Sequence, residues 1–209
     1  MGQAVLTGDL VGSSRAGAAA TTSAMEVLSR ECATMADWAG GDLRFTRYRG
    51  DGWQAIVPAP QKALRVTLTL LAWLRASDLP TSRVAIGFGE MQLPATRDLS
   101  AAAGPAFEAA GRALDEMGRD TRLACAGPAD RALVGALPLA DAIVRGWTVK
   151  QAEALIHTLP PEPPAQIRIA EALNIRPQSL SERLEAARFW ALEASLAVIE
   201  KGNGSGHKA

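Results

Sequence analysis

The spacing of apolar and polar residues changes several times along the first half of the chain. Residues 4–11 are an apolar run of strand length that contains one aspartate. Residues 17–38 are rich in Ala, Met and Leu at helical spacing and end near a Gly-Gly pair. Residues 43–58 alternate apolar and polar side chains around a Gly-Asp-Gly sequence. This alternation predicts a hairpin with Asp51 and Gly52 in its turn.

A second helix and a fourth strand complete the first predicted unit of the fold. Residues 61–76 have the pattern of an amphipathic helix, and residues 82–90 that of a strand. The resulting order, β-α-β-β-α-β, predicts an α+β fold of the ferredoxin-like type. In that fold the sheet is antiparallel and both helices cover one face.

The remainder of the chain is mainly helical in pattern. A helix over 103–117, a short strand over 122–127 and a short helix over 128–136 are predicted first. After Trp147 the pattern predicts only helices, and these lie at 148–159, 165–175 and 177–200, with a Pro-rich connector at 160–164. We therefore predict three parts: a sheet domain (1–143), a helix-turn-helix domain (144–201) and a flexible tail (202–209).

Composition narrows the class of protein. Lys plus Arg and Asp plus Glu both number 22, so net charge alone does not favour a nucleic acid or an anionic membrane. The two cysteines, Cys32 and Cys125, are far apart, which is typical of reduced thiols in the cytosol. No signal peptide is apparent, and Arg65 interrupts the longest apolar stretch. We expect a cytoplasmic protein with no membrane contact.

The first candidate site consists of two carboxylates. An isolated buried aspartate is costly, so Asp9 should be paired, hydrogen-bonded or bound to a metal ion. In the predicted sheet, the hairpin tip that carries Asp51 reaches the same edge as Asp9. Two converging carboxylates favour Mg²⁺ or Mn²⁺ between them. The alternative is that Asp51 is only the polar half of an Asp-Gly turn and that Asp9 is a local cap.

A phosphate-binding loop could follow the first strand. Gly12, Ser13 and Ser14 lead toward the start of a helix, where backbone N–H groups attract anions.

The second candidate site is a helix-turn-helix in "QIRIAEALNIRPQSLSERLEAA", residues 166–187. Asn174 tolerates the left-handed backbone that the turn often needs, and Pro177 suits the first turn of the second helix. The apolar positions that would pack the two helices are Ile169, Ala170, Leu173, Ile175, Leu180 and Leu184. Trp147 would complete a three-helix core.

In DNA-binding versions of this motif, the second helix enters the major groove. Its early residues, which would contact base edges, are Gln178, Ser179, Ser181, Glu182 and Arg183. Residues 165–201 carry five basic and five acidic side chains, so phosphate contacts would rely on dimerisation and on Lys150, Arg176 and Arg183. The alternative is a helical packing module that serves dimer contacts.

The last predicted helix carries a broad apolar stripe. Its members are Phe189, Trp190, Leu192, Leu196, Val198 and Ile199. Such a stripe packs against the rest of the protein or against a second copy, and a homodimer is expected.

Four motifs occur in the order that resembles class III nucleotide cyclase homology domains. They are "GDLVGSS", "RYRGDGWQAIV", "RVAIGFGE" and "GPAFEAAGRAL". Together with the helix-turn-helix, the chain from 1 to about 200 resembles the SatD family. The resemblance implies that Asp9 and Asp51 bind a metal ion. It also implies that the backbone of Leu10, Val11 and Gly12 contacts a triphosphate.

The same resemblance gives Arg112 the place of an arginine that stabilises a phosphoryl transition state, which a guanidinium does by neutralising charge. Arg112 could instead pair with Asp115. Three positions depart from the cyclase pattern: Arg47 and Ala101 replace base-reading residues, and Glu108 replaces an asparagine that orients the ribose.

The departures lead us to expect a catalytically degenerate sensor that binds a nucleotide or polyphosphate with Mg²⁺ and regulates DNA binding. The alternatives are an active cyclase or other phosphoryl-transfer enzyme, in which Arg112 would be catalytic, and an adaptor homodimer.

Overall fold

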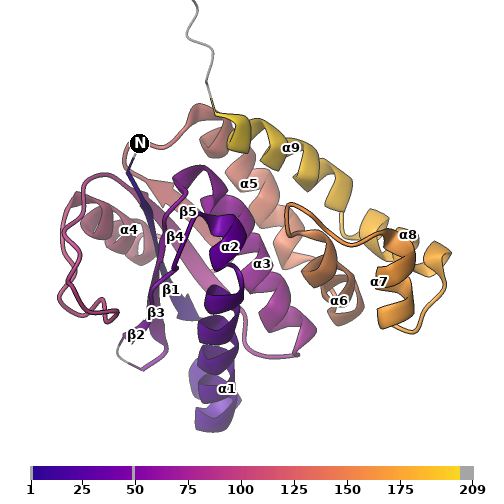
Figure 1. Ribbon diagram of the computed structural model, residues 1–209. Helices are drawn as coiled ribbons and strands as arrows, with labels where there is room; N and C mark the ends of the chain where they lie inside the picture. Colours follow the sequence, from indigo (N-terminus) through magenta and orange to yellow (C-terminus); the bar gives the residue numbers. More distant parts are fainter. Residues whose placement is uncertain (1, 49, 203–209) are drawn as a thin grey trace, which may run out of the picture.

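A computed structural model describes residues 2–48 and 50–202 (Figure 1). Its sheet has the order β2-β3-β1-β4-β5. The strands are β1 (Ala4–Leu10), β2 (Phe45–Tyr48), β3 (Gly52–Val57), β4 (Ser82–Phe88) and β5 (Leu123–Ala126). Neighbouring strands are antiparallel except for β4 and β5, which are parallel. The four strands of the predicted β-α-β-β-α-β unit are therefore antiparallel, as expected, and β5, whose pairing was not predicted, adds a parallel edge.

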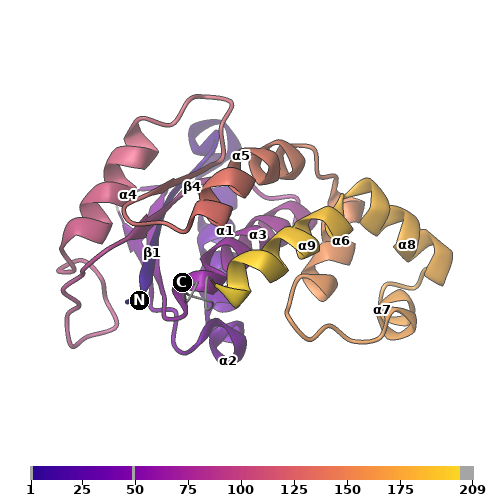
Figure 2. The ribbon, with the colours of Figure 1, turned by 90° about the horizontal axis from the view of Figure 1, so that it is seen from above.

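Side chains of β1 alternate between two apolar clusters, because successive residues of a strand face opposite sides. Leu6 and Leu10 belong to the larger cluster, and Val5 belongs to the smaller one. The larger cluster includes α1 (Ser13–Thr34), α2 (Ala36–Ala39) and α3 (Ala63–Ala76), which follows the short 3-10 helix η1 (Pro60–Lys62). Helix α4 (Pro105–Asp115) covers the opposite face, as Figure 2 shows. Helices α1 and α3 therefore cover one face, as predicted.

After β5, the described part of the chain forms five helices. They are α5 (Arg131–Arg145), α6 (Val149–Thr158), α7 (Gln166–Ala172), α8 (Pro177–Ala186) and α9 (Phe189–Lys201). Their buried side chains join the larger cluster on the sheet. The proposed division near residue 144 thus lies within continuous apolar packing, and it stays a prediction. Of the predicted tail, residues 203–209 lie outside the described residues.

Two predicted helices have different bounds. The first begins at Ser13 rather than 17, because Gly17 (φ 86°, ψ 167°) allows a non-helical kink inside α1. The helix predicted over 128–136 extends to Arg145, across Pro138. Leu133, Leu137 and Val144 are buried at helical spacing, so apolar packing holds α5 together where proline removes one hydrogen bond.

The predicted helix over 177–200 is two helices. Arg188 adopts a left-handed conformation (φ 57°, ψ 31°) and separates α8 from α9. At this break the indole N–H of Trp147 donates to the carbonyl of Ala187 over 3.2 Å. The break lets Leu192 and Leu196 of α9 face the main core.

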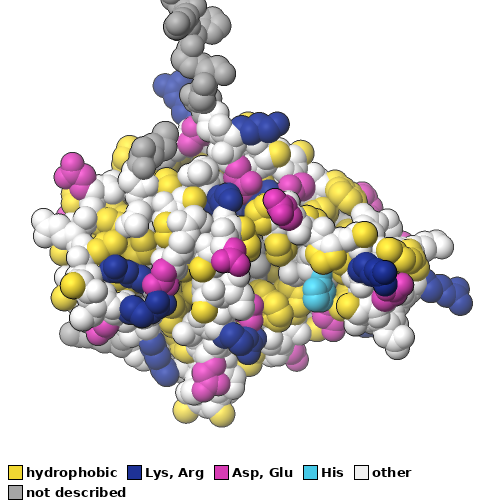
Figure 3. Space-filling view, viewed as in Figure 1, with side chains coloured by type: hydrophobic (Ala, Val, Ile, Leu, Met, Phe, Trp, Pro, Cys, Tyr) yellow, Lys and Arg dark blue, Asp and Glu magenta, His cyan; other side chains and the backbone are white. Residues whose placement is uncertain are grey.

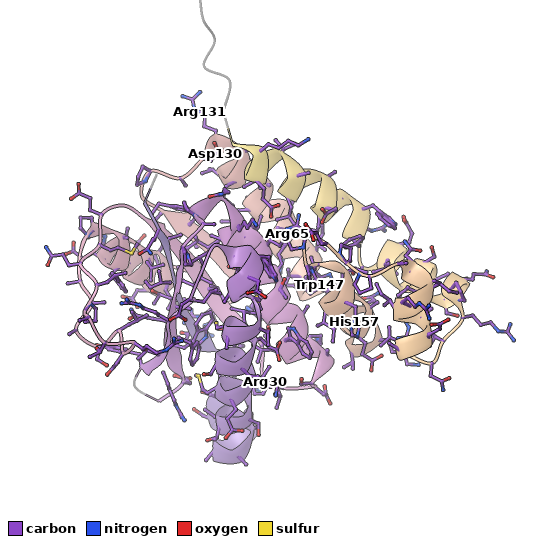
Figure 4. The ribbon with its side chains drawn as sticks, in the orientation of Figure 1. Arg30, Arg65, Asp130, Arg131, Trp147 and His157 are labelled. Atoms are coloured by element: carbon purple, nitrogen blue, oxygen red, sulfur yellow. The ribbon has the colours of Figure 1, made fainter. Side chains whose placement is uncertain are left out.

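A buried arginine joins the two halves of the chain. Arg65 of α3 is 2 % exposed and points toward α9 (Figure 4). Its guanidinium donates to Glu193 over 2.7 and 3.0 Å and to Glu200 over 2.5 and 3.2 Å. It also donates to the carbonyl of Leu159 over 2.7 Å. The charge that interrupts the apolar stretch is therefore paired rather than exposed.

No helix in the described part of the chain has the length and apolar character of a membrane span.

Candidate functional site

Asp9 lies at the rim where β1 meets β3 and β4. Its register partners are Gly52 on β3 and Arg83 on β4. The Nε of Arg83 donates to Oδ1 of Asp9 over 2.9 Å, and Nη2 donates to Oδ2. The pKa of Arg83 is raised above its ordinary value, first by the hydrogen bonds to Asp9. The expected partner of Asp9 is therefore Arg83, a residue to which no sequence pattern assigned a role.

Asp51 lies next to Asp9 along the rim but has a different partner. Its carbonyl accepts the N–H of Leu10 over 3.1 Å, which joins the hairpin tip to the end of β1. Its carboxylate accepts the hydroxyl of Ser13, at the start of α1. The structure thus brings the two backbones together, while the carboxylates bind separate side chains.

A hollow of about 400 Å³ lies beside Asp51. Its lining includes three predicted site residues: Ser13, Arg47 and Asp51. Arg47 is exposed, and its Nε donates to the carbonyl of Gly50 over 2.9 Å. The remaining polar side chains of the lining are Ser14, Thr21 and Thr22. Ser13 donates to Asp51 and Thr21 donates to the carbonyl of Gly17. The groups left to bind an anion beside the Asp51 carboxylate are the Arg47 guanidinium and the hydroxyls of Ser14 and Thr22.

The backbone of the predicted phosphate loop is partly used within the protein. The N–H of Leu10 donates to Asp51, and the N–H of Val11 donates to the carbonyl of Thr81 over 2.8 Å. Neither amide is available to a phosphate in this arrangement. Gly12, in a left-handed conformation, and Ser13 are the remaining members of the loop.

The position of the rim depends on Gly8. A Cβ there would lie 2.6 Å from the indole of Trp53 and 2.7 Å from the carbonyl of Arg83. The indole N–H of Trp53 donates to the hydroxyl of Ser82 over 2.9 Å, and that hydroxyl lies 2.7 Å from the carbonyl of Asp9. The Gly-Asp pair therefore lets a buried tryptophan support the strand end that carries the carboxylate.

The other residues implied by the cyclase resemblance are not part of this hollow. Arg112 and Glu108 are exposed on α4, and Ala101 is exposed before it. Among the ion pairs of the described residues, Arg112 takes no part, so its alternative pairing with Asp115 is not formed. Arg112 stays a prediction as a functional residue.

The side chains at the rim do not fit a divalent metal ion well. Both carboxylate oxygens of Asp9 accept N–H groups of Arg83, and Asp51 accepts a hydroxyl. Within residues 2–48 and 50–202, no three His, Cys, Asp or Glu side chains form a metal-binding group. A metal ion at Asp9 would have to displace Arg83.

A larger cavity than this hollow lies at the other end of the sheet. It measures about 740 Å³ and includes Phe88, Glu90, Met91 and Pro105 in its lining. None of the predicted site residues lines it. The volume of a cavity therefore does not indicate where the predicted site residues lie.

The helical module follows the predicted packing closely. Ile169, Ala170, Leu180 and Leu184 are buried between α7 and α8, and Trp147 is buried beside them. Asn174, in the turn between the helices, has the positive φ (51°) that its residue type was expected to tolerate. Pro177 begins α8, and Thr148 caps α6 through a capping box with Gln151.

The predicted DNA-contacting side chains fall into two groups. Lys150, Arg176 and Ser181 are exposed. The other three side chains are bound within the protein or less exposed. Gln178 is exposed, but its amide donates to Glu182 over 3.0 Å. Ser179 is half-buried, and Arg183 forms an ion pair with Glu153 at 3.0 Å. Basic and acidic side chains lie side by side at this end of the molecule (Figure 3).

No family model matches the chain, and no curated protein matches it. The site is therefore judged on its geometry alone.

Two contacts that matter were missed from the sequence. A charged residue in an apolar helix signals a buried pair, and two glutamates seven residues apart share a helix face, so Arg65, Glu193 and Glu200 carried a usable signal. The pair of Arg83 with Asp9 carried none, because it depends on the register between β1 and β4.

Proposed function

We propose that this protein is a cytoplasmic DNA-binding regulator whose helical module, α6 to α8, contacts DNA. The observation that carries the proposal is the arrangement of α7 and α8. Two short helices pack through Ile169, Ala170, Leu180 and Leu184 and are joined by a tight turn at Asn174. This is the arrangement in which a second helix is presented to the major groove.

Exposed polar residues support a contact at the start of α8. Arg176 precedes the helix, and Gln178 and Ser181 lie in its first turns with exposed side chains. Arginine binds phosphate, whereas amide and hydroxyl groups can read base edges. Because Glu182 and Glu185 are exposed on the same helix, a single module has little excess positive charge. Two modules in a homodimer would double the phosphate contacts.

A second copy is also favoured by exposed apolar side chains. The stripe of the last helix is divided: Leu192 and Leu196 are buried in the main core, whereas Trp190 and Val198 are 48 % and 63 % exposed. Leu139 of α5 is 70 % exposed. A contiguous patch of exposed apolar side chains marks a protein interface, and α5 packs against α9. We include the homodimer in the proposal on this ground.

We further propose that the sheet part is a ferredoxin-like sensor of the SatD type that binds an anionic ligand, a nucleotide or polyphosphate. The order β2-β3-β1-β4 and the placement of α1 and α3 on one face support that fold. The hollow with Ser13, Arg47 and Asp51 supports an anion-binding role. The departures from the cyclase pattern at Arg47, Ala101 and Glu108 argue against cyclisation.

The proposal includes a coupling of ligand binding to DNA binding through the Arg65 cluster, which consists of Arg65, Glu193 and Glu200. This cluster ties α3, which lies on the sheet, to α9, which follows the DNA-contacting helix. A ligand that binds one arrangement of these helices better would shift the population toward it.

A gel-shift experiment tests the proposal. The full chain is mixed with a pool of genomic fragments at low and at high salt, and retained fragments are identified. We expect retention at low salt that weakens as salt rises. Arg176→Ala should weaken binding to every sequence and reduce the salt slope by about one. Arg131→Ala is the matched control, because Arg131 is exposed at the far end of the molecule (Figure 4). No retained fragment at low salt would reject the DNA proposal.

Calorimetry tests the sensor separately. Tripolyphosphate and nucleoside triphosphates are titrated into the wild type and into Arg47→Ala. Binding by the wild type that Arg47→Ala weakens supports the anion site, and equal heats from both proteins contradict it.

A further inference from the structure

We propose that Arg83 takes the place of a divalent metal ion at Asp9, so that the rim carries its own cation and binds neither Mg²⁺ nor Mn²⁺ there. The register of β1 and β4 places the two residues directly opposite each other. Side chains of directly opposite residues in an antiparallel strand pair are close enough to interact. The guanidinium of Arg83, a residue of strand β4, is therefore the cation beside Asp9.

The contact occupies both oxygens that a metal ion would need. Nε of Arg83 donates to Oδ1 over 2.9 Å and Nη2 donates to Oδ2, which is the fork geometry of a bidentate pair. The side chains are only 28 % and 26 % exposed. On its far side, Nη1 lies 3.4 Å from the carbonyl of Met117, in the segment after α4. The guanidinium is thus tethered at its site, and a free ion has to compete with it.

Neighbouring charges explain why a cation is needed there. Arg83 interacts electrostatically with Asp115 and Asp51 in addition to Asp9. Without Arg83, the carboxylate of Asp9 would lose the cation bound to both of its oxygens while Asp51 stays beside it on the rim, and like charges repel. Removing the arginine should therefore raise the affinity of Asp9 for a hard divalent cation, because carboxylate oxygens are its preferred ligands.

The consequence for a ligand at this rim is that an anion would be held by guanidinium and hydroxyl donors without a metal bridge. This mode of anion binding rests on the proposed anion site. The assignment of Arg83 does not, because its test measures metal binding in the absence of nucleotide and DNA.

Titration with Mn²⁺, followed by the electron paramagnetic resonance signal of the free ion, tests the assignment on the full chain. The variants are Arg83→Met, Asp9→Asn, the combination of these two, and Arg97→Met. Arg97 forms the control pair, an exposed contact with Asp42 at 2.5 Å on another part of the surface. We expect the wild type and Arg97→Met to leave Mn²⁺ free, Arg83→Met to gain a bound ion, and the added Asp9→Asn to remove it.

Two results would overturn the assignment. One is Mn²⁺ bound by the wild type and lost in Asp9→Asn, which would show that Arg83 does not replace the metal. The other is an Arg83→Met variant that retains the wild-type circular dichroism spectrum and gains no bound ion. If Arg83→Met does not fold, the comparison of the wild type with Asp9→Asn decides. Mn²⁺ that the wild type binds and Asp9→Asn does not bind overturns the assignment. A wild type that binds no Mn²⁺ supports it.

Discussion

Arg65 of α3 and Glu193 of α9 are 128 positions apart in sequence and share two hydrogen bonds, at 2.7 and 3.0 Å. The guanidinium is buried, while Glu193 is 36 % exposed and Glu200, its second partner, is 16 % exposed. Burial tends to lower the pKa of Arg65, but the hydrogen bonds to the two glutamates raise it above its ordinary value. This cluster fixes the last helix against the sheet layer.

Replacing Arg65 with Met should lower the free energy of unfolding by about 2–4 kcal/mol, because two carboxylates lose their partner in a partly buried site. Urea denaturation measures the change. The control is Arg168→Met, whose ion pair with Glu171 is 74 % and 56 % exposed and should contribute no more than about 0.5 kcal/mol. Equal effects of the two substitutions would show that the buried cluster does not stabilise the fold.

Gly8→Ala should destabilise the protein by about 1–3 kcal/mol, since the added methyl group overlaps Trp53 and the β4 backbone. The tryptophan fluorescence spectrum should also change, because the Trp53 indole has to move. Gly111→Ala is the matched control: its Cβ enters open space in the middle of α4, and it should stabilise by about 0.5–1 kcal/mol. A Gly8→Ala protein as stable as the wild type would contradict the packing at the rim.

Cys32 makes stability depend on pH in the alkaline range. Burial, followed by the charges of Glu31 and Asp42, raises the pKa of the Cys32 thiol to about 12. The folded state therefore holds the thiol proton that the unfolded state releases above an ordinary pKa of about 8.5. The stabilisation is complete below that pH and is lost as pH rises toward 12.

The stability difference between the wild type and Cys32→Ala measures this effect. It should shrink by up to about 1.4 kcal/mol per pH unit above the ordinary thiol pKa. Urea denaturation at about pH 8 and about pH 10.5 gives the two values to compare. A difference that stays constant between them would place Cys32 in a more solvated environment than this structure gives it.

Asn174 tests the turn of the helical module. Asn174→Val should destabilise by about 1–2 kcal/mol, because a β-branched residue resists the left-handed backbone found there. Asn174→Gly should be close to neutral, since glycine adopts that backbone freely. Thermal unfolding of the two variants decides the matter, and a Val variant as stable as the Gly variant would indicate a different turn.

Local sequence patterns predicted the order of elements well. Alternation around residues 43–58 predicted the hairpin, although Gly52, expected in its turn, is the first residue of β3. The spacing from Ile169 to Leu184 predicted two packed helices with their turn. These features depend on neighbours in sequence. Helix α5 was predicted too short because Pro138 is a helix breaker, although the buried spacing of Leu133, Leu137 and Val144 continues past it.

What the sequence could not supply depends on contacts between distant segments. The left-handed Arg188 that divides α8 from α9 follows from the packing of Leu192 and Leu196 on the core and from Trp147 at the break. At the candidate site, the meeting of β1 with the hairpin tip was anticipated, but the partner of Asp9 was not. The register that places Arg83 opposite Asp9 can be known only once the strands are paired.

Fluorescence anisotropy is the sharpest test of whether α8 reads DNA. A labelled fragment recovered from the genomic pool is titrated with the full chain and compared, at one fixed salt concentration, with a scrambled fragment of equal length and composition. We expect tighter binding to the recovered fragment and loss of that preference in a Gln178→Ala, Ser181→Ala double variant. Equal binding to both fragments, or none to either, would contradict it.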